Sequence, residues 1–153
     1  MYPPCLALKA ALDQQQMTPA ELAQQLRDRF NRKRADKQEL NGLYIQGLIT
    51  GQAYVPDTLR SYIAQIFDQT VKETFPEYLI ECHTLRALRT EHNLKLSDLA
   101  EKAGDHAFKS IRSADISAYQ CGHRYCHADT RDAIATALGL SVAEVFPEYQ
   151  AFG

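Results

Sequence analysis

The chain has 153 residues, a formal net charge of −2, and a composition of 45% hydrophobic and 24% charged residues. These values are typical of a globular protein. They exclude a disordered or fibrous chain and a polycation held on nucleic acid by bulk charge. No stretch approaches the roughly 18 apolar residues of a membrane span, and the N-terminal residues lack a signal-peptide pattern. We therefore expect a cytoplasmic protein with no membrane partner and with its four cysteines reduced.

The sequence contains an internal repeat. The motif FPEY occurs at residues 75–78 and again 71 residues later, and residues 40–78 align with residues 111–149 without a gap. Toward the N-terminus the offset becomes 77, which pairs residues 5–23 with residues 82–100. The repeat predicts two related units, residues 1–77 and residues 78–153, of which the first has the longer connection after residue 23.

Helical signals follow one another through the first unit. Apolar residues around positions 8–12 recur at helical spacing and predict a first helix. Thr18 and Glu21 fit a capping box with Pro19 at the first helical position, so a second helix begins there. A third apolar stripe includes Leu40, and we expect the third helix to extend N-terminally through it and to end at Gly51, which tolerates a positive φ.

The second unit repeats these signals, with a third helix that includes Ile111 and ends at Gly122. Fourth helices are expected over about residues 57–67 and 129–138. Fifth helices follow the capping boxes that begin at Thr70 and Ser141. No alternating β-branched run competes with these helices. The fold class is therefore predicted to be all-α, with two tandem bundles of about five short helices each.

Four segments of the second unit carry a family resemblance: LRALR (85–89), LKLSDLAEKAG (94–104), ISAYQCGHRYC (116–126) and IATALGLSVAEVF (134–146). In this order they resemble the lambda-repressor-like helix-turn-helix family, which includes Cro, phage repressors and the xenobiotic-response-element regulators. The first unit keeps a fainter version in LKAAL, MTPAELA and IAQIF. The resemblance implies two tandem helix-turn-helix units and a sequence-specific, nucleoid-associated regulator of transcription.

Two departures from the family pattern keep an alternative open. The connection between the second and third helices is longer than the family's tight turn in both units. The family also commonly places a phosphate-contacting glutamine near the start of the second helix, where this chain has Pro19 and Leu96. The alternative is a helix-turn-helix-derived adaptor, an anti-repressor or antiactivator, that binds protein and no longer reads DNA.

A helix in the major groove contacts base edges near its N-terminal end, while surrounding basic residues bind phosphates. In the second unit this criterion selects Lys109, Ser110, Arg112, Ser113, Ser117 and Gln120, although Asp115 at the same end is expected to repel phosphate. In the first unit six basic residues lie within residues 27–37, a run that predicts a phosphate clamp, a solvated loop or a docking site for an acidic partner. The predicted DNA contacts there are Arg29, Arg32, Lys33, Arg34, Lys37, Gln38 and Asn41.

Cys121, His123, Cys126 and His127 lie within seven residues, and this invites a zinc interpretation. Their spacing is not that of a tetrahedral site, which draws its ligands from two separate elements. We therefore expect no metal and a structural role for the cluster, with redox or pH sensing as the alternative. No catalytic motif or cofactor-binding glycine loop occurs, so we expect neither an enzyme nor a cofactor.

The predicted partner is double-stranded DNA. One tandem chain would occupy an asymmetric site, whereas a homodimer would occupy a longer palindrome. A protein partner in the transcription machinery also stays open at this point.

Overall fold

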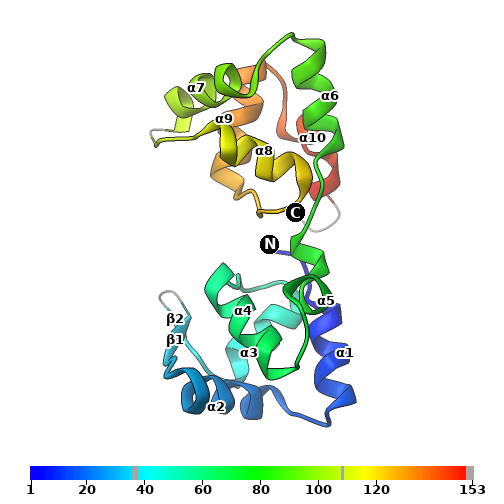
Figure 1. Cartoon of the computed structure of the whole chain (residues 1–153), viewed down its shortest axis with the longest axis vertical. Helices are drawn as coiled ribbons and strands as arrows, with labels where there is room; N and C mark the ends of the chain where they lie inside the picture. Colours follow the sequence, from blue (N-terminus) through cyan, green and yellow to red (C-terminus); the bar gives the residue numbers. More distant parts are fainter. Residues whose placement is uncertain (36–37, 108, 151–153) are drawn as a thin grey trace. The chain divides into compact units, whose positions relative to one another are not determined.

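A computed structural model of the chain describes residues 1–35, 38–107 and 109–150. The chain divides into two compact units, with the boundary between Glu77 and Tyr78 (Figure 1). The described residues form ten α-helices and only two strands, of two residues each, so the predicted all-α class is confirmed.

The first unit begins with helices and has a pair of short strands before its third helix. In chain order its elements are α1 (Leu6–Gln14), α2 (Pro19–Phe30), β1 (Arg34–Ala35), β2 (Gln38–Glu39), α3 (Gly42–Thr50), α4 (Asp57–Ile66) and α5 (Val71–Thr74). A short 3-10 helix, η1 (Pro76–Tyr78), follows at the boundary. Within this unit α2 packs on α3 and α4, and α1 packs on α3 and α5.

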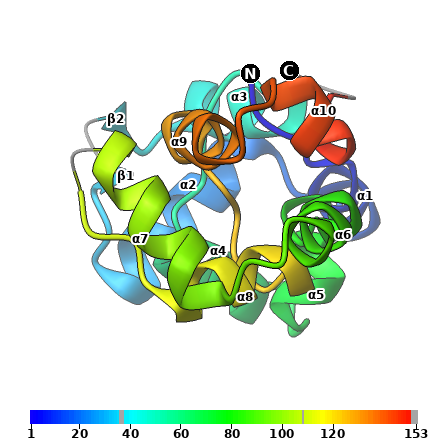
Figure 2. The same cartoon turned by 90° about the horizontal axis from the view of Figure 1, so that it is seen from above.

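The second unit repeats the order of the helices: α6 (His83–Glu91), α7 (Leu96–Ala107), α8 (Ser113–Cys121), α9 (Ala128–Leu138), α10 (Val142–Val145) and the 3-10 helix η2 (Pro147–Tyr149). The helix α7 packs on α8 and α9 (Figure 1 and Figure 2). Corresponding helices have equal lengths, with the exception of α4 and α9, which have ten and eleven residues. The sequence repeat is therefore also a repeat of local structure.

The predicted helix signals act as expected. Thr18 accepts a hydrogen bond from Glu21 N–H in a complete capping box, and the boxes at Thr70 and Ser141 are also complete. Gly51 ends α3 with a φ of 83°, a conformation that glycine adopts without steric cost. A Cβ there would also lie 2.5 Å from the backbone oxygen of Tyr2, so the chain packs too closely for a side chain.

The predicted N-terminal extension of the third helices is wrong. Leu40 is fully buried, but it precedes Asn41, whose extended backbone and side chain cap α3 by accepting a hydrogen bond from Tyr44 N–H. In place of extra helical turns, β1 and β2 form an antiparallel pair in which Arg34 lies opposite Glu39. In the second unit α8 begins at Ser113, after the position of Ile111.

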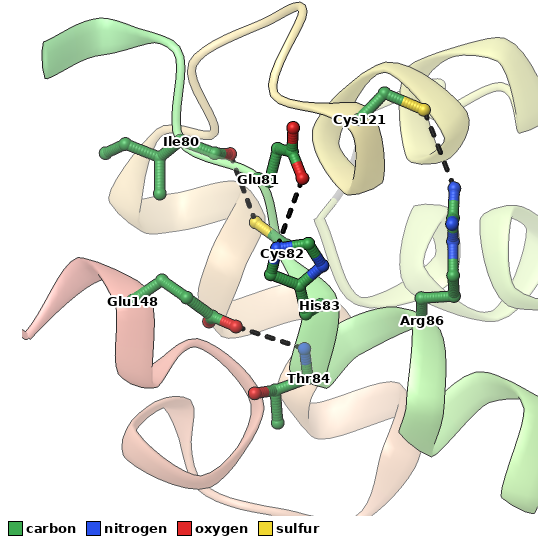
Figure 3. Close-up of polar contacts among 8 residues, drawn as sticks. All are labelled: Ile80, Glu81, Cys82, His83, Thr84, Arg86, Cys121 and Glu148. Carbon is green, nitrogen blue, oxygen red and sulfur yellow. Dashed lines mark hydrogen bonds and ion pairs between the residues drawn. The ribbon is translucent and has the colours of Figure 1, made fainter.

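The FPEY motif closes each unit onto its first helix. The phenylalanine and tyrosine of both copies are buried, and the glutamate between them reaches the N-terminus of a helix distant in sequence. Glu77 accepts a hydrogen bond from Ala7 N–H at 2.8 Å, and Glu148 accepts one from Thr84 N–H at 3.0 Å (Figure 3). Since neither α1 nor α6 has a side-chain cap of its own, these carboxylates satisfy a free N–H group and complement the helix dipole.

A buried cysteine and a buried arginine accompany each of these glutamates. Burial raises the pKa of both Cys5 and Cys82 to about 12; the nearby Glu77 or Glu148 acts in the same direction, and Arg60 or Arg131 acts against it. Both thiols are therefore protonated and unreactive near neutral pH. Each thiol donates to a carbonyl two residues earlier, as Cys82 does to Ile80 (Figure 3).

Replacing Glu148 by alanine should lower the free energy of unfolding by about 1–2 kcal/mol, because a helix N-terminus loses both its acceptor and a favourable charge. Glu148→Gln should cost less, since the amide oxygen still accepts a hydrogen bond. Urea titration followed by circular dichroism measures both losses, with Glu101→Ala on the exposed side of α7 as the control. A loss for Glu148→Ala no larger than the control's would contradict the capping role.

Candidate nucleic-acid interface

In the first unit the predicted interface lies around the end of α2, the β1–β2 pair and the start of α3. Arg29, Lys33, Arg34 and Gln38 are exposed there, while Lys37 lies outside the described residues. Leu40 N–H donates to the carbonyl of Lys33 at 3.1 Å, so a backbone hydrogen bond joins the described residues on the two sides of this connection. Lys33 and Arg34 are thus held beside Leu40, which lies two residues before the start of α3.

Two arginines of the same run are used by the fold itself. Arg27 donates to the backbone oxygen of Leu40 and so ties the end of α2 to the residues before α3. Arg32 is half-buried, with its guanidinium 5.7 Å from the centre of the Tyr62 ring. Asn41 caps α3, so its side-chain oxygen is already engaged. Fewer side chains of the basic run are therefore available to bind phosphate than the sequence predicted. Arg32 is restricted by its packing on Tyr62.

An aromatic pair that the sequence analysis missed holds this region against α4. Phe30, the last residue of α2, stacks on Tyr62 with ring centres 4.4 Å apart and an interplanar angle of 16°. The guanidinium of Arg29 lies over the ring of Phe30, 5.5 Å from the ring centre. Phe30 is the only apolar side chain in residues 27–34. Its isolation among charged and polar residues is the feature of the sequence that could have identified it as the anchor of this run.

In the second unit the corresponding surface surrounds the start of α8. Lys109, Ser110, Arg112 and Ser113 are exposed, and Ser117 is half-buried one turn further along. Lys109 pairs with Asp129 at 3.3 Å, but both side chains are well exposed, so this pair is weak and leaves the lysine available to another anion.

Gln120 does not belong to this exposed surface. It is only 5% exposed, and its side-chain oxygen accepts a hydrogen bond from Arg89 Nε at 2.9 Å. Arg89 in turn donates to the backbone oxygen of Leu94 at 2.8 Å. This network joins α6 to α8, so we interpret Gln120 as a packing residue and leave it out of the candidate interface.

Asp115 does not act as the free negative charge that the sequence suggested. Its side chain is 12% exposed, and its carboxylate accepts hydrogen bonds from Arg112 N–H at 2.9 Å and from the guanidinium of Arg124. The pKa of Asp115 is lowered, first by the backbone hydrogen bond from Arg112 and further by the charges of both arginines, against the opposing effect of burial. The carboxylate is thus compensated, and Arg112 remains 73% exposed beside it.

The Cys/His cluster does not converge. Cys126 is fully buried, and its N–H donates to the hydroxyl of Tyr149, whereas His123 and His127 are exposed. Cys121 accepts a hydrogen bond from Arg86 at 3.7 Å (Figure 3). Burial raises the pKa of the Cys126 thiol far above its ordinary value. Within the described part of the chain, no group of three or more His, Cys, Asp or Glu side chains is arranged to hold a metal ion.

Comparisons of the chain with protein-family models, curated proteins and solved structures found no significant match. Functional inference therefore depends on the two surfaces at the starts of α3 and α8. None of the described helices has the length and apolar character needed to cross a membrane.

The Asp115 network predicts a pH-dependent contribution to stability. The pKa of Asp115 is lower in the folded protein than the ordinary value near 3.9 of the unfolded chain. Its ionised carboxylate should therefore stabilise the fold fully at pH values above this ordinary pKa, and the effect should be lost as the pH falls through the folded pKa. Urea titrations should give a free-energy difference between wild type and Asp115→Asn that is full at about pH 6 and shrinks below about pH 4. A difference that is constant across this range would show that the charge contributes nothing; the exposed Asp105→Asn is measured in parallel as the control.

Proposed function

We propose that this protein is a regulator of transcription that binds double-stranded DNA through two helix-turn-helix units of the lambda-repressor-like kind. The observation that carries the proposal is the set of exposed cations in and beside the connection that leads to the third helix in each unit. In the first unit these are Arg29, Lys33 and Arg34, and in the second Lys109 and Arg112.

The arrangement of the helices supports this proposal. In each unit a twelve-residue helix packs on the nine-residue helix that follows it, α2 on α3 and α7 on α8. Polar side chains that can contact base edges, such as Gln46 on α3 and Ser113 on α8, are exposed on the shorter helix. A helix presented in this way has the dimensions needed to enter the major groove.

The distribution of charge suggests how affinity and specificity divide. Residues 1–78 hold nine basic and nine acidic side chains, and residues 79–153 hold eight and ten. Attraction to phosphate therefore comes from the local clusters and gives only modest non-specific binding. Because α3 and α8 differ in sequence, a single chain should prefer an asymmetric operator, whereas a homodimer would prefer a longer palindrome.

The second candidate function is an adaptor that binds a protein of the transcription machinery. It is favoured by Pro19 and Leu96 at the positions where the family commonly has a phosphate-contacting glutamine. The exposed Asp28 and Glu39, which lie among the cations of the first unit, also favour it. An adaptor of this kind would show no dependence of DNA binding on the basic run.

Replacing Lys33 and Arg34 together by alanine separates the two functions. Both side chains are exposed, so the fold should be retained, and a DNA-binding protein should lose affinity about equally for all duplexes. The slope of log K against log salt should become shallower by about 0.9 for each phosphate that the variant no longer neutralises. Fluorescence anisotropy over a salt series measures both quantities.

The matched control removes two other exposed lysines of the first unit, Lys9 and Lys72, which lie on α1 and α5. The proposal requires that this control keep the wild-type affinity and slope. Equal behaviour of the two double variants would favour the adaptor.

A further inference from the structure

Leu43 is a large apolar side chain that the fold leaves exposed to solvent. It is the second residue of α3 and is 84% exposed, while its neighbours Tyr44 and Ile45 are buried. Burying a leucine removes its apolar surface from water and stabilises the fold, and Leu43, which stays in contact with solvent, contributes almost nothing in this way. Among the described residues, the other large apolar side chains that are exposed, Met1 and Leu6, are less so, at 72% and 64%.

Polar side chains with hydrogen-bonding capacity surround Leu43. A shallow hollow of about 410 Å³ is lined by Leu43 together with Gln38, Asn41 and Gln52, and Glu39 also contributes to it. The side-chain amides of Gln38 and Gln52 can both donate and accept hydrogen bonds, as base edges in the major groove require, whereas the Asn41 oxygen already caps α3. The surface therefore combines one apolar contact with several polar ones.

The same surface continues into the exposed cations. Glu39 lines the hollow and lies opposite Arg34 in the β1–β2 pair, and the residue before Arg34 is Lys33. The two cations Lys33 and Arg34 outnumber the one carboxylate of Glu39, and this local excess of positive charge favours a polyanion as the occupant. A single exposed leucine is also too small an apolar patch for a stable protein interface, which buries about 1,200–2,000 Å² in total.

We propose that Leu43 recognises a thymine through contact with its C5 methyl group in the major groove. This inference rests on the proposed DNA-binding function and adds a specificity-determining residue to it. The thymine methyl is the apolar group that bases present in the major groove, and a leucine near the N-terminal end of α3 is suited to contact it. The corresponding residue of α8 is Ala114, a smaller apolar side chain, so the two units should differ in preference for thymine.

Deoxyuridine tests this contact directly, because it differs from thymidine only by the missing C5 methyl group. Each thymine of the duplex motif selected by the purified protein is replaced in turn by deoxyuridine, and the affinities of wild type and Leu43→Ala are measured. At one position the replacement should weaken wild-type binding about three- to tenfold. Leu43→Ala should bind the thymine and deoxyuridine duplexes equally at that position.

Leu6→Ala is the matched control, since Leu6 is the first residue of α1 and is 64% exposed. It should keep the full effect of the methyl group. If Leu43→Ala also keeps that effect, or if no thymine in the motif is sensitive, the role of Leu43 is overturned while DNA binding stands. If the protein selects no duplex motif at all, the proposed function and this inference both fail.

Discussion

Each unit is closed by a hydrogen bond between the N-terminus of its first helix and the glutamate of its FPEY motif. Neither α1 nor α6 carries a side-chain cap, so its exposed N–H groups need an acceptor from elsewhere. Glu77 and Glu148 supply one from the opposite end of the same repeat. The buried phenylalanine and tyrosine of each FPEY motif anchor that glutamate in the core. In the sequence, the second and third helices lie between the two ends that this contact joins. The hydrogen bond that closes the unit therefore also encloses the helix pair that carries the proposed interface.

Much of the fold could be predicted because its signals are local. The capping box at Thr18 and the glycine at the end of α3 are determined by a few neighbouring residues, and both behave as expected. The start of α3 was mispredicted because Leu40 is buried in phase with the helical stripe although its backbone lies outside the helix. Periodicity reports which side chains are buried, whereas the helix boundary depended on the cap formed by Asn41.

The candidate site was less predictable, because sequence identifies charges but not their partners. The basic run was evident, yet only tertiary contacts determine that Arg27 bonds to the backbone before α3 and that Arg32 packs over Tyr62. The same limit applies to Gln120, which was assigned to the surface and is buried against Arg89. A prominent charge cluster therefore overstates the number of side chains available to a ligand.

Selection of bound duplexes from a randomised DNA library tests the central claim most directly. The purified full chain is used at about physiological salt, where non-specific binding is weak, with a no-protein control. Two different third helices in one chain should enrich an asymmetric motif, or a longer palindrome if two chains bind together. If no motif is enriched above the control, even at low salt, the account of this protein as a DNA-binding regulator is contradicted.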